Sequence, residues 1–220
     1  MSKKLVWDAT GEKKFETGVK KGVLYPQVEG AYPKGYAWNG LTAVNENPSG
    51  AEATALWAND AKYGNLYSNE EFAATVEAFT YPKEFEACDG SKELAPGVYI
   101  GQQERQPFGL SYVTTIGNDT EGLNHGYKIH LIYGAVAAPS AKDHSTVNES
   151  PEAMTMSWEL STTPVAVTGA KPTAHLVIDS TVVEAEKLAL IEAALYGTDE
   201  AEAYLPTPDQ VAAIIKGEAA

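Results

Sequence analysis

Arginine is almost absent from this sequence of 220 residues, and acidic residues outnumber basic ones. Arg105 is the single arginine among 16 basic residues. Acidic residues number 30, so the formal net charge is −14. Such a chain lacks the stripe of Lys and Arg side chains that neutralises phosphates, so tight nucleic-acid binding is not expected. An acidic surface also keeps a protein soluble, and composition alone favours this simpler explanation.

Cysteine and long apolar runs are also missing. Cys88 is the one cysteine, so the chain can form no intrachain disulfide and has no zinc-finger spacing. No run reaches the roughly 18 apolar residues of a membrane span, and the start, MSKKLVWDATGEKK, has no apolar segment of a secretory signal. We therefore expect a protein that matures in a cytoplasm and has no membrane partner.

Motifs of nucleophilic catalysis and phosphate binding are missing too. Glycine-rich phosphate loops are absent. Ser111 lies in GLSYV, where Val113 replaces the second glycine of a GxSxG motif. Cys88 has no local base beside it, and a small buried thiol is the simpler interpretation. We expect a protein that is not an enzyme, with no catalytic residues and no cofactor.

Metal-binding spacings are equally hard to find. The four histidines make no HExxH motif, and we expect ordinary core or surface histidines at His125, His130, His144 and His175. The loop GNDTEG offers oxygens from Asn118, Asp119 and Glu121, but turns of this composition are far commoner than calcium sites. The sequence therefore predicts no metal site.

Alternation of apolar and polar residues is the main structural signal. In AMTMSWELSTTPV (153–165) the apolar residues, Trp158 among them, fall on one side of an extended chain. In YKIHLIYGAV (127–136), Tyr127, Ile129 and Leu131 share a face with Tyr133. Further strands are expected in KLVWD, FETGVKKGVLYP, ATVEAFTY, LSYVTTI and AHLVIDS. These patterns predict a mainly β protein, an antiparallel β-sandwich or barrel.

Helical spacing is confined to two segments at the end of the chain and a short one near Gly90. In EAEKLALIEAALYG, apolar residues at 188, 191 and 195 form one stripe, and Gly197 is placed to end the helix. In TPDQVAAIIKG, Thr207 is the expected N-cap, with Gln210 completing a capping box. KEFEACDG predicts a short flanking helix or turn.

A long segment, residues 38–69, has little periodicity and is rich in Asn, Gly, Pro and Ser. Connections of this length are usually disordered or functional. Its large apolar and aromatic residues, such as Trp57 and Tyr63, argue against disorder. We interpret it as a long arm that docks on a partner.

The ordered set of segments resembles the major tail protein, or tail tube protein, of long-tailed bacteriophages infecting Gram-positive bacteria. The segments are GVKKGVLYP, AWNGLTAVNENPSGAEATALWANDAKYGNLYSNEEF, VEAFTYPKEF, QPFGLSYVTTIGND, GYKIHLIYGAVAAPSAKDHSTVNESPEAMTMSWELSTTPV and KPTAHLVIDST. The resemblance covers about residues 5–181. It divides the chain into a tail-tube β domain (1–181) and a helical C-terminal extension (182–220).

The resemblance implies a structural virion protein that is made in the host cytoplasm. Subunits of this family form hexameric rings, which stack around the tape-measure protein between the distal tail proteins and the tail terminator. DNA leaves the virion through the channel without specific binding, and acidic residues lining it would let phosphates slide. The arm at 38–69 and the loop at 137–151 are candidates for contacts between rings.

Two other functions remain open at this point. The first is another wall component of a phage tail, a tail terminator or the tube of an injection system. The second is a carbohydrate-binding β-sandwich, because 12 Tyr and four Trp could build a sugar-binding face. Most of these aromatic residues lie at strand positions typical of a core.

Overall fold

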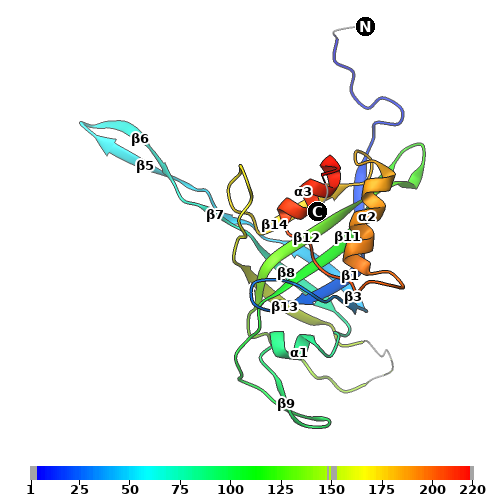
Figure 1. Ribbon diagram of the computed structural model, residues 1–220. Coiled ribbons are helices and arrows are strands. Elements are labelled where there is room, and N and C mark those ends of the chain that lie inside the picture. Colours follow the sequence, from blue (N-terminus) through cyan, green and yellow to red (C-terminus); the bar gives the residue numbers. More distant parts are fainter. Residues whose placement is uncertain (1–3, 148, 150–152, 219–220) are drawn as a thin grey trace.

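The body of the protein is one curved antiparallel sheet of eight strands (Figure 1). The computed structural model describes residues 4–147, 149 and 153–218. The strands follow the order β2-β1-β11-β12-β13-β8-β3, and β14 also pairs with β12. Their bounds are β1 Phe15–Pro26, β2 Tyr36–Trp38, β3 Leu41–Glu46, β8 Ala73–Ala78, β11 Phe108–Asn118, β12 Gly122–Ala137, β13 Met156–Thr162 and β14 His175–Asp179. The predicted mainly β, antiparallel fold is confirmed.

The sheet rolls up until its two ends nearly meet. Strands β2 and β3 stand at opposite ends of the strand order, yet only two residues of chain separate them. The backbone N–H of Phe79 donates to the Gly40 carbonyl in this connection, at 2.8 Å. A Cβ atom on Gly22 of β1 would lie 3.0 Å from a methyl carbon of Leu41. The result is a partly closed barrel.

The barrel interior holds the first hydrophobic core. Trp158 of β13 is fully buried there, with ring centroids 5.8 Å from Trp38 and 5.1 Å from Phe85. Phe85 comes from the short helix α1 (Phe85–Cys88), which was expected as a flanking helix. Large aromatic rings fill this space because a rolled sheet leaves a wide interior that aliphatic side chains alone do not fill.

The second core lies on the outer face of the sheet, beneath helices α2 (Ala185–Tyr196) and α3 (Pro208–Lys216). Leu188, Ile191 and Leu195 pack there, as their spacing predicts. The buried hydroxyl of Tyr25 in β1 donates to the Leu195 carbonyl at 2.7 Å. The division after residue 181 therefore does not separate two cores, because α2 and α3 complete the core of the β domain.

At Gly134 the strand that pairs with β12 changes from β14 to β13. Residues 128–132 of β12 pair with β14, and residues 135–137 pair with β13. The register with β11 shifts in the same stretch, and Gly134 has a φ of 58°. A Cβ atom there would lie 2.3 Å from the Thr163 carbonyl oxygen, so only glycine fits this bulge.

The predicted helix ends are confirmed and one predicted strand is wrong. Thr207 caps α3 in a capping box with Gln210, and Gly197 and Gly217 end the two helices. The segment KLVWD was expected to be a strand, but its described residues 4–8 form none, and Trp7 is 75% exposed. Leu5 and Val6 are also more than 70% exposed, so the described part of the chain does not bury this apolar segment.

We expect Trp158→Ala to lower the free energy of unfolding by about 3–5 kcal/mol, since it empties a large buried site. Denaturant titration followed by circular dichroism measures this loss. Trp57→Ala is the matched control, because the Trp57 side chain is 70% exposed and its removal should cost less than about 0.5 kcal/mol. Equal losses in the two variants would contradict the assignment of Trp158 to the core.

Candidate functional site

A long β-hairpin arm projects from the body of the molecule (Figure 1). Its base pairs β4 (Ser49–Gly50) with β7 (Glu70–Glu71), and its outer part pairs β5 (Ala53–Ala58) with β6 (Ala61–Tyr67). Asn59 and Asp60 make the two-residue turn at the tip, with φ angles of 50° and 60°. Two successive residues with positive φ are typical of the type I′ turn that suits a twisted hairpin.

The arm carries large apolar side chains in water. The most exposed are Leu56, Trp57, Tyr63, Leu66 and Tyr67, between 44% and 81% exposed. Leu56 and Leu66 lie on one face, because their cross-strand partners are Gly64 and Thr54. A two-stranded hairpin with no second layer is only marginally stable in water. Clustered exposed apolar groups of this kind mark a surface that contacts another molecule.

The structure narrows the arm that the sequence predicts over 38–69. Trp38 is buried in the barrel core, and residues 41–46 form β3 of the main sheet. The arm comprises residues 49–71 instead. The local signal for this hairpin is the pair Asn59-Asp60, two residue types that tolerate positive φ, between segments that each carry aromatic residues.

A second hairpin projects from the body below α1, away from the arm (Figure 1). It pairs β9 (Lys92–Ala95) with β10 (Val98–Ile100). Leu94, Val98, Tyr99 and Ile100 on it are exposed. The molecule therefore has two separate hairpins with exposed apolar side chains.

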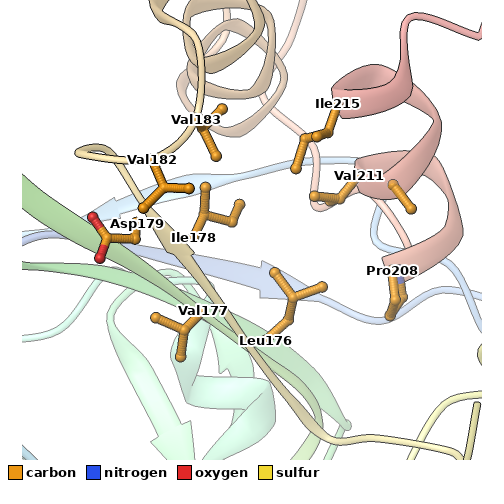
Figure 2. Close-up of a pocket in the computed structure, with 10 residues that line it drawn as sticks. Leu176, Val177, Ile178, Asp179, Val182, Val183, Pro208, Val211 and Ile215 are labelled. Atoms are coloured by element: carbon orange, nitrogen blue, oxygen red, sulfur yellow. The ribbon is translucent and has the colours of Figure 1, made fainter. Parts of the chain in front are cut away.

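An apolar groove runs between β14 and α3 (Figure 2). Its volume is ≈ 330 Å³. The lining is Leu176, Val177, Ile178, Asp179, Val182, Val183, Pro208, Val211, Ala212 and Ile215. In the described part of the chain β14 pairs with β12 alone, so its other edge has backbone groups without a neighbouring strand. An unpaired edge beside apolar side chains is a ready site for pairing with another chain.

The loop predicted at 137–151 is anchored at its start. The Lys142 ammonium lies 2.8 Å from one carboxylate oxygen of Asp89, and the Arg105 guanidinium lies 3.4 Å from the other. Arg105 also donates to the Ala137 carbonyl, at 2.9 Å. The single arginine thus holds the loop against the end of α1. Residues 148, 150 and 151 of this loop lie outside the described residues.

The residues considered for nucleophilic catalysis lie in the protein interior. Ser111 is fully buried and its hydroxyl lies 3.1 Å from the Tyr25 hydroxyl. Cys88 is also fully buried, and burial raises the pKa of its thiol to about 12. A thiol with this pKa stays protonated at neutral pH, so Cys88 is the small buried thiol that the sequence indicates.

The GNDTEG loop uses its oxygens in turn hydrogen bonds. The side-chain oxygen of Asn118 accepts from the backbone N–H groups of Thr120 and Glu121, at 3.2 and 2.6 Å. A carboxylate oxygen of Asp119 accepts from the backbone N–H of Gly11 at 3.0 Å. Asn118 therefore stabilises the turn of its own loop, and Asp119 connects the loop to the N-terminal segment.

A polar cluster lies at one end of the barrel interior, formed by Glu46 of β3, His130 of β12 and His175 of β14. Nδ1 of His130 lies 3.2 Å from Oε1 of Glu46 and 3.4 Å from Nε2 of His175. Nε2 of His175 lies 3.5 Å from the same Glu46 oxygen. Each of these residues can supply one metal-ligand atom.

Aromatic stacking fixes the orientation of both imidazole rings. The ring of Tyr112 stacks on His130 with centroids 4.6 Å apart and planes 6° apart. The ring of Phe72 stacks on His175 at 4.5 Å and 20°. The Tyr112 hydroxyl donates to Oε1 of Glu46 at 2.6 Å. Burial lowers the pKa of both histidines, against the opposing effect of the Glu46 carboxylate, and this favours neutral imidazoles.

The sequence did not reveal this cluster, because His130 and His175 are 45 residues apart. Their proximity follows from the pairing of β12 with β14, in which His130 is opposite Val177 and His175 is opposite Ile132. The two histidines are therefore diagonal neighbours on the same face of the sheet. The local signal is limited to a polar residue in an apolar segment: His130 lies between Ile129 and Leu131, and His175 precedes the apolar residues of β14.

No helix in the described part of the chain is long and apolar enough to cross a membrane. No protein-family model and no curated protein matches the chain.

Comparison of the fold with solved structures finds similar chains, among them the following two. One is a chain of the anti-feeding prophage (AFP) baseplate, 6-fold symmetrised, with 8% identity and a TM-score of 0.40 over 79% of this chain and 97% of that chain. The other belongs to the sheath-tube complex of an extracellular contractile injection system (PVC) in its extended state, with 12% identity and a TM-score of 0.37 over 72% and 88% of the two chains. Similarity this low assigns no role.

We expect trypsin to cut the isolated subunit after Lys62 much faster than after Lys128. Lys62 lies near the tip of the exposed arm, whereas Lys128 lies within the central strand β12. Segments with few buried contacts open locally at little cost, and cleavage follows that opening. Mass spectrometry of the first fragments measures the order of cleavage. First cleavage at Lys128 would show that the arm packs on the body in solution.

Proposed function

We propose that this protein is a structural subunit that self-assembles into rings, and that stacked rings form the tube of a phage tail. The single observation that carries the proposal is the arm over residues 49–71. It displays Trp57, Tyr63 and Leu66 to solvent and has no layer of its own chain to cover them. A surface with this composition is costly in a free subunit and becomes favourable when a neighbouring copy covers it.

The open edge of β14 supports the same role. A neighbouring strand at this edge would satisfy its backbone groups, and the groove beside it would bury apolar side chains of the neighbour. Pairing of this kind around a ring extends the sheet from one subunit to the next. A barrel closed across subunits has no remaining edges, which removes the risk of uncontrolled aggregation.

The resemblance of residues 5–181 to tail tube proteins supplies the finer features of the proposal. The rings are hexameric, they stack around a tape-measure protein, and the tube connects the tail terminator to the distal tail proteins. The protein is part of the virion tail and its role involves no catalysis. The arm and the loop at 137–151 make the contacts between successive rings.

The acidity of the chain has a use in this role. DNA carries one phosphate charge for about every 1.7 Å of its length, so a channel lined by Lys would hold it through counterion release. A lining of Asp and Glu repels the phosphates instead. Screening limits the repulsion to about 8 Å at physiological salt, so only residues facing the channel contribute.

We expect the purified chain to form rings or tubes of constant bore, and Leu66→Ser to suppress them. Leu66 is 62% exposed on the arm, and truncating an interface anchor costs about 2 kcal/mol or more of binding free energy. Leu190→Ser is the matched control, since Leu190 is 59% exposed on α2, away from the arm. Negative-stain electron microscopy and sedimentation velocity measure the fraction of assembled protein.

Two results would overturn the proposal. One is a wild-type chain that stays monomeric at all concentrations; retention of that monomer on a glycan column would then indicate carbohydrate binding through the exposed aromatic residues. The other is equal assembly of the Leu66→Ser and Leu190→Ser variants, which would remove the arm from the contact.

A further inference from the structure

We propose that Glu46, His130 and His175 bind one divalent transition-metal ion, with zinc the best match to this ligand set. Three ligand atoms converge from three strands: Oε1 of Glu46, Nδ1 of His130 and Nε2 of His175. Two imidazole nitrogens and one carboxylate oxygen are a common set of protein ligands for zinc, with a fourth position left to water.

The distances among the three atoms fit a metal ion at their centre. They are 3.2, 3.4 and 3.5 Å, a nearly equilateral triangle. Ligands held at about 2.1 Å by a tetrahedral zinc ion are about 3.4 Å apart. The centroids of the two imidazole rings are 5.5 Å apart, farther than their facing nitrogens, so the rings converge through those nitrogens.

The hydrogen bonds around His130 leave a lone pair on the nitrogen that faces the centre. The Thr114 hydroxyl donates to Oε1 of Glu16 at 2.5 Å, so its oxygen accepts a hydrogen bond from Nε2 of His130, at 3.0 Å. In a neutral imidazole with a proton on Nε2, Nδ1 carries the lone pair. That nitrogen lies 3.2 Å from Oε1 of Glu46 and 3.4 Å from Nε2 of His175. A cation bound among the three atoms would replace the unfavourable approach of the lone pair to the carboxylate with a bond to each of them.

The same contacts provide the outer shell that metal-binding histidines usually have. The chain from His130 through Thr114 to Glu16 matches the pattern in which a ligating imidazole donates its other N–H toward a carboxylate. Tyr112 donates to the ligating oxygen of Glu46 and also stacks on His130. Orientation of the ligands is therefore set before any ion arrives.

The site is reachable from solvent. The side chains of Glu46 and His175 are 34% and 17% exposed, whereas that of His130 is 8% exposed. Bound metal would link β3 to β12 and β14. Since β3 leads directly into the base of the arm, the ion would hold the root of the arm against the barrel (Figure 1).

The test uses the untagged full-length chain, stripped with EDTA and titrated with zinc sulfate against a chromophoric chelator. We expect one saturable zinc ion per chain, and a melting temperature that rises with zinc concentration because the ion binds only the folded state. Cobalt(II) in place of zinc should give the visible absorption of a tetrahedral site. A chain that binds no zinc, or several ions equally weakly, overturns the proposal.

Substitutions assign the binding to these residues. Glu46→Gln and His175→Gln should each lower zinc affinity at least about 100-fold, and Thr114→Val about 10- to 100-fold through the outer shell. His144→Ala is the matched control and should leave affinity unchanged, since His144 is exposed in the loop after β12. Circular dichroism verifies folding, and Glu46→Gln decides the outcome if His175→Gln unfolds. Unchanged affinity in folded Glu46→Gln contradicts the site.

Discussion

Strands β11 and β12 send alternate side chains into two different hydrophobic cores, and this alternation organises the whole fold. Leu110 and Ile132 point into the barrel, whereas Val113 and Leu131 point outward to the helices. Side chains in a strand alternate between faces with a period of two, so a strand buried on both faces becomes apolar throughout. The central strands can bury both faces only because the barrel supplies one cover and helices α2 and α3 supply the other.

This double cover leaves the periphery of the sheet for contact with other molecules. The arm and the β9–β10 hairpin lie outside the two cores, and the groove beside β14 opens at the edge of the second core. Each has exposed apolar residues, among them Trp57, Leu94 and Val177. The body does not need these residues for its own stability, because its cores are already filled. These exposed residues can therefore contact a neighbouring subunit without any loss of core packing, which agrees with the proposed role in a ring.

The polar cluster occupies the one end of the barrel interior where aromatic rings give way to charged groups. Tyr112 stands at this boundary, with its ring in the apolar core and its hydroxyl on Glu46. Buried polar groups require partners, and here the partners come from strands β3, β11, β12 and β14 at once. A network held from several strands keeps its geometry when one strand moves slightly. The proposed metal site therefore has ligands and supporting contacts from four strands.

Elements with a local signal can be predicted from the order of the amino acids. The alternation around Trp158, the capping box at Thr207 and the helix stop at Gly197 depend on neighbours within a few residues, and each is present as predicted. Three other features follow from the way distant segments pack: α2 and α3 complete the core of the sheet, Trp38 is buried, and His130 lies next to His175. These outcomes depend on strand order and on a bulge at Gly134, and pairing between distant segments leaves no periodic trace along the chain.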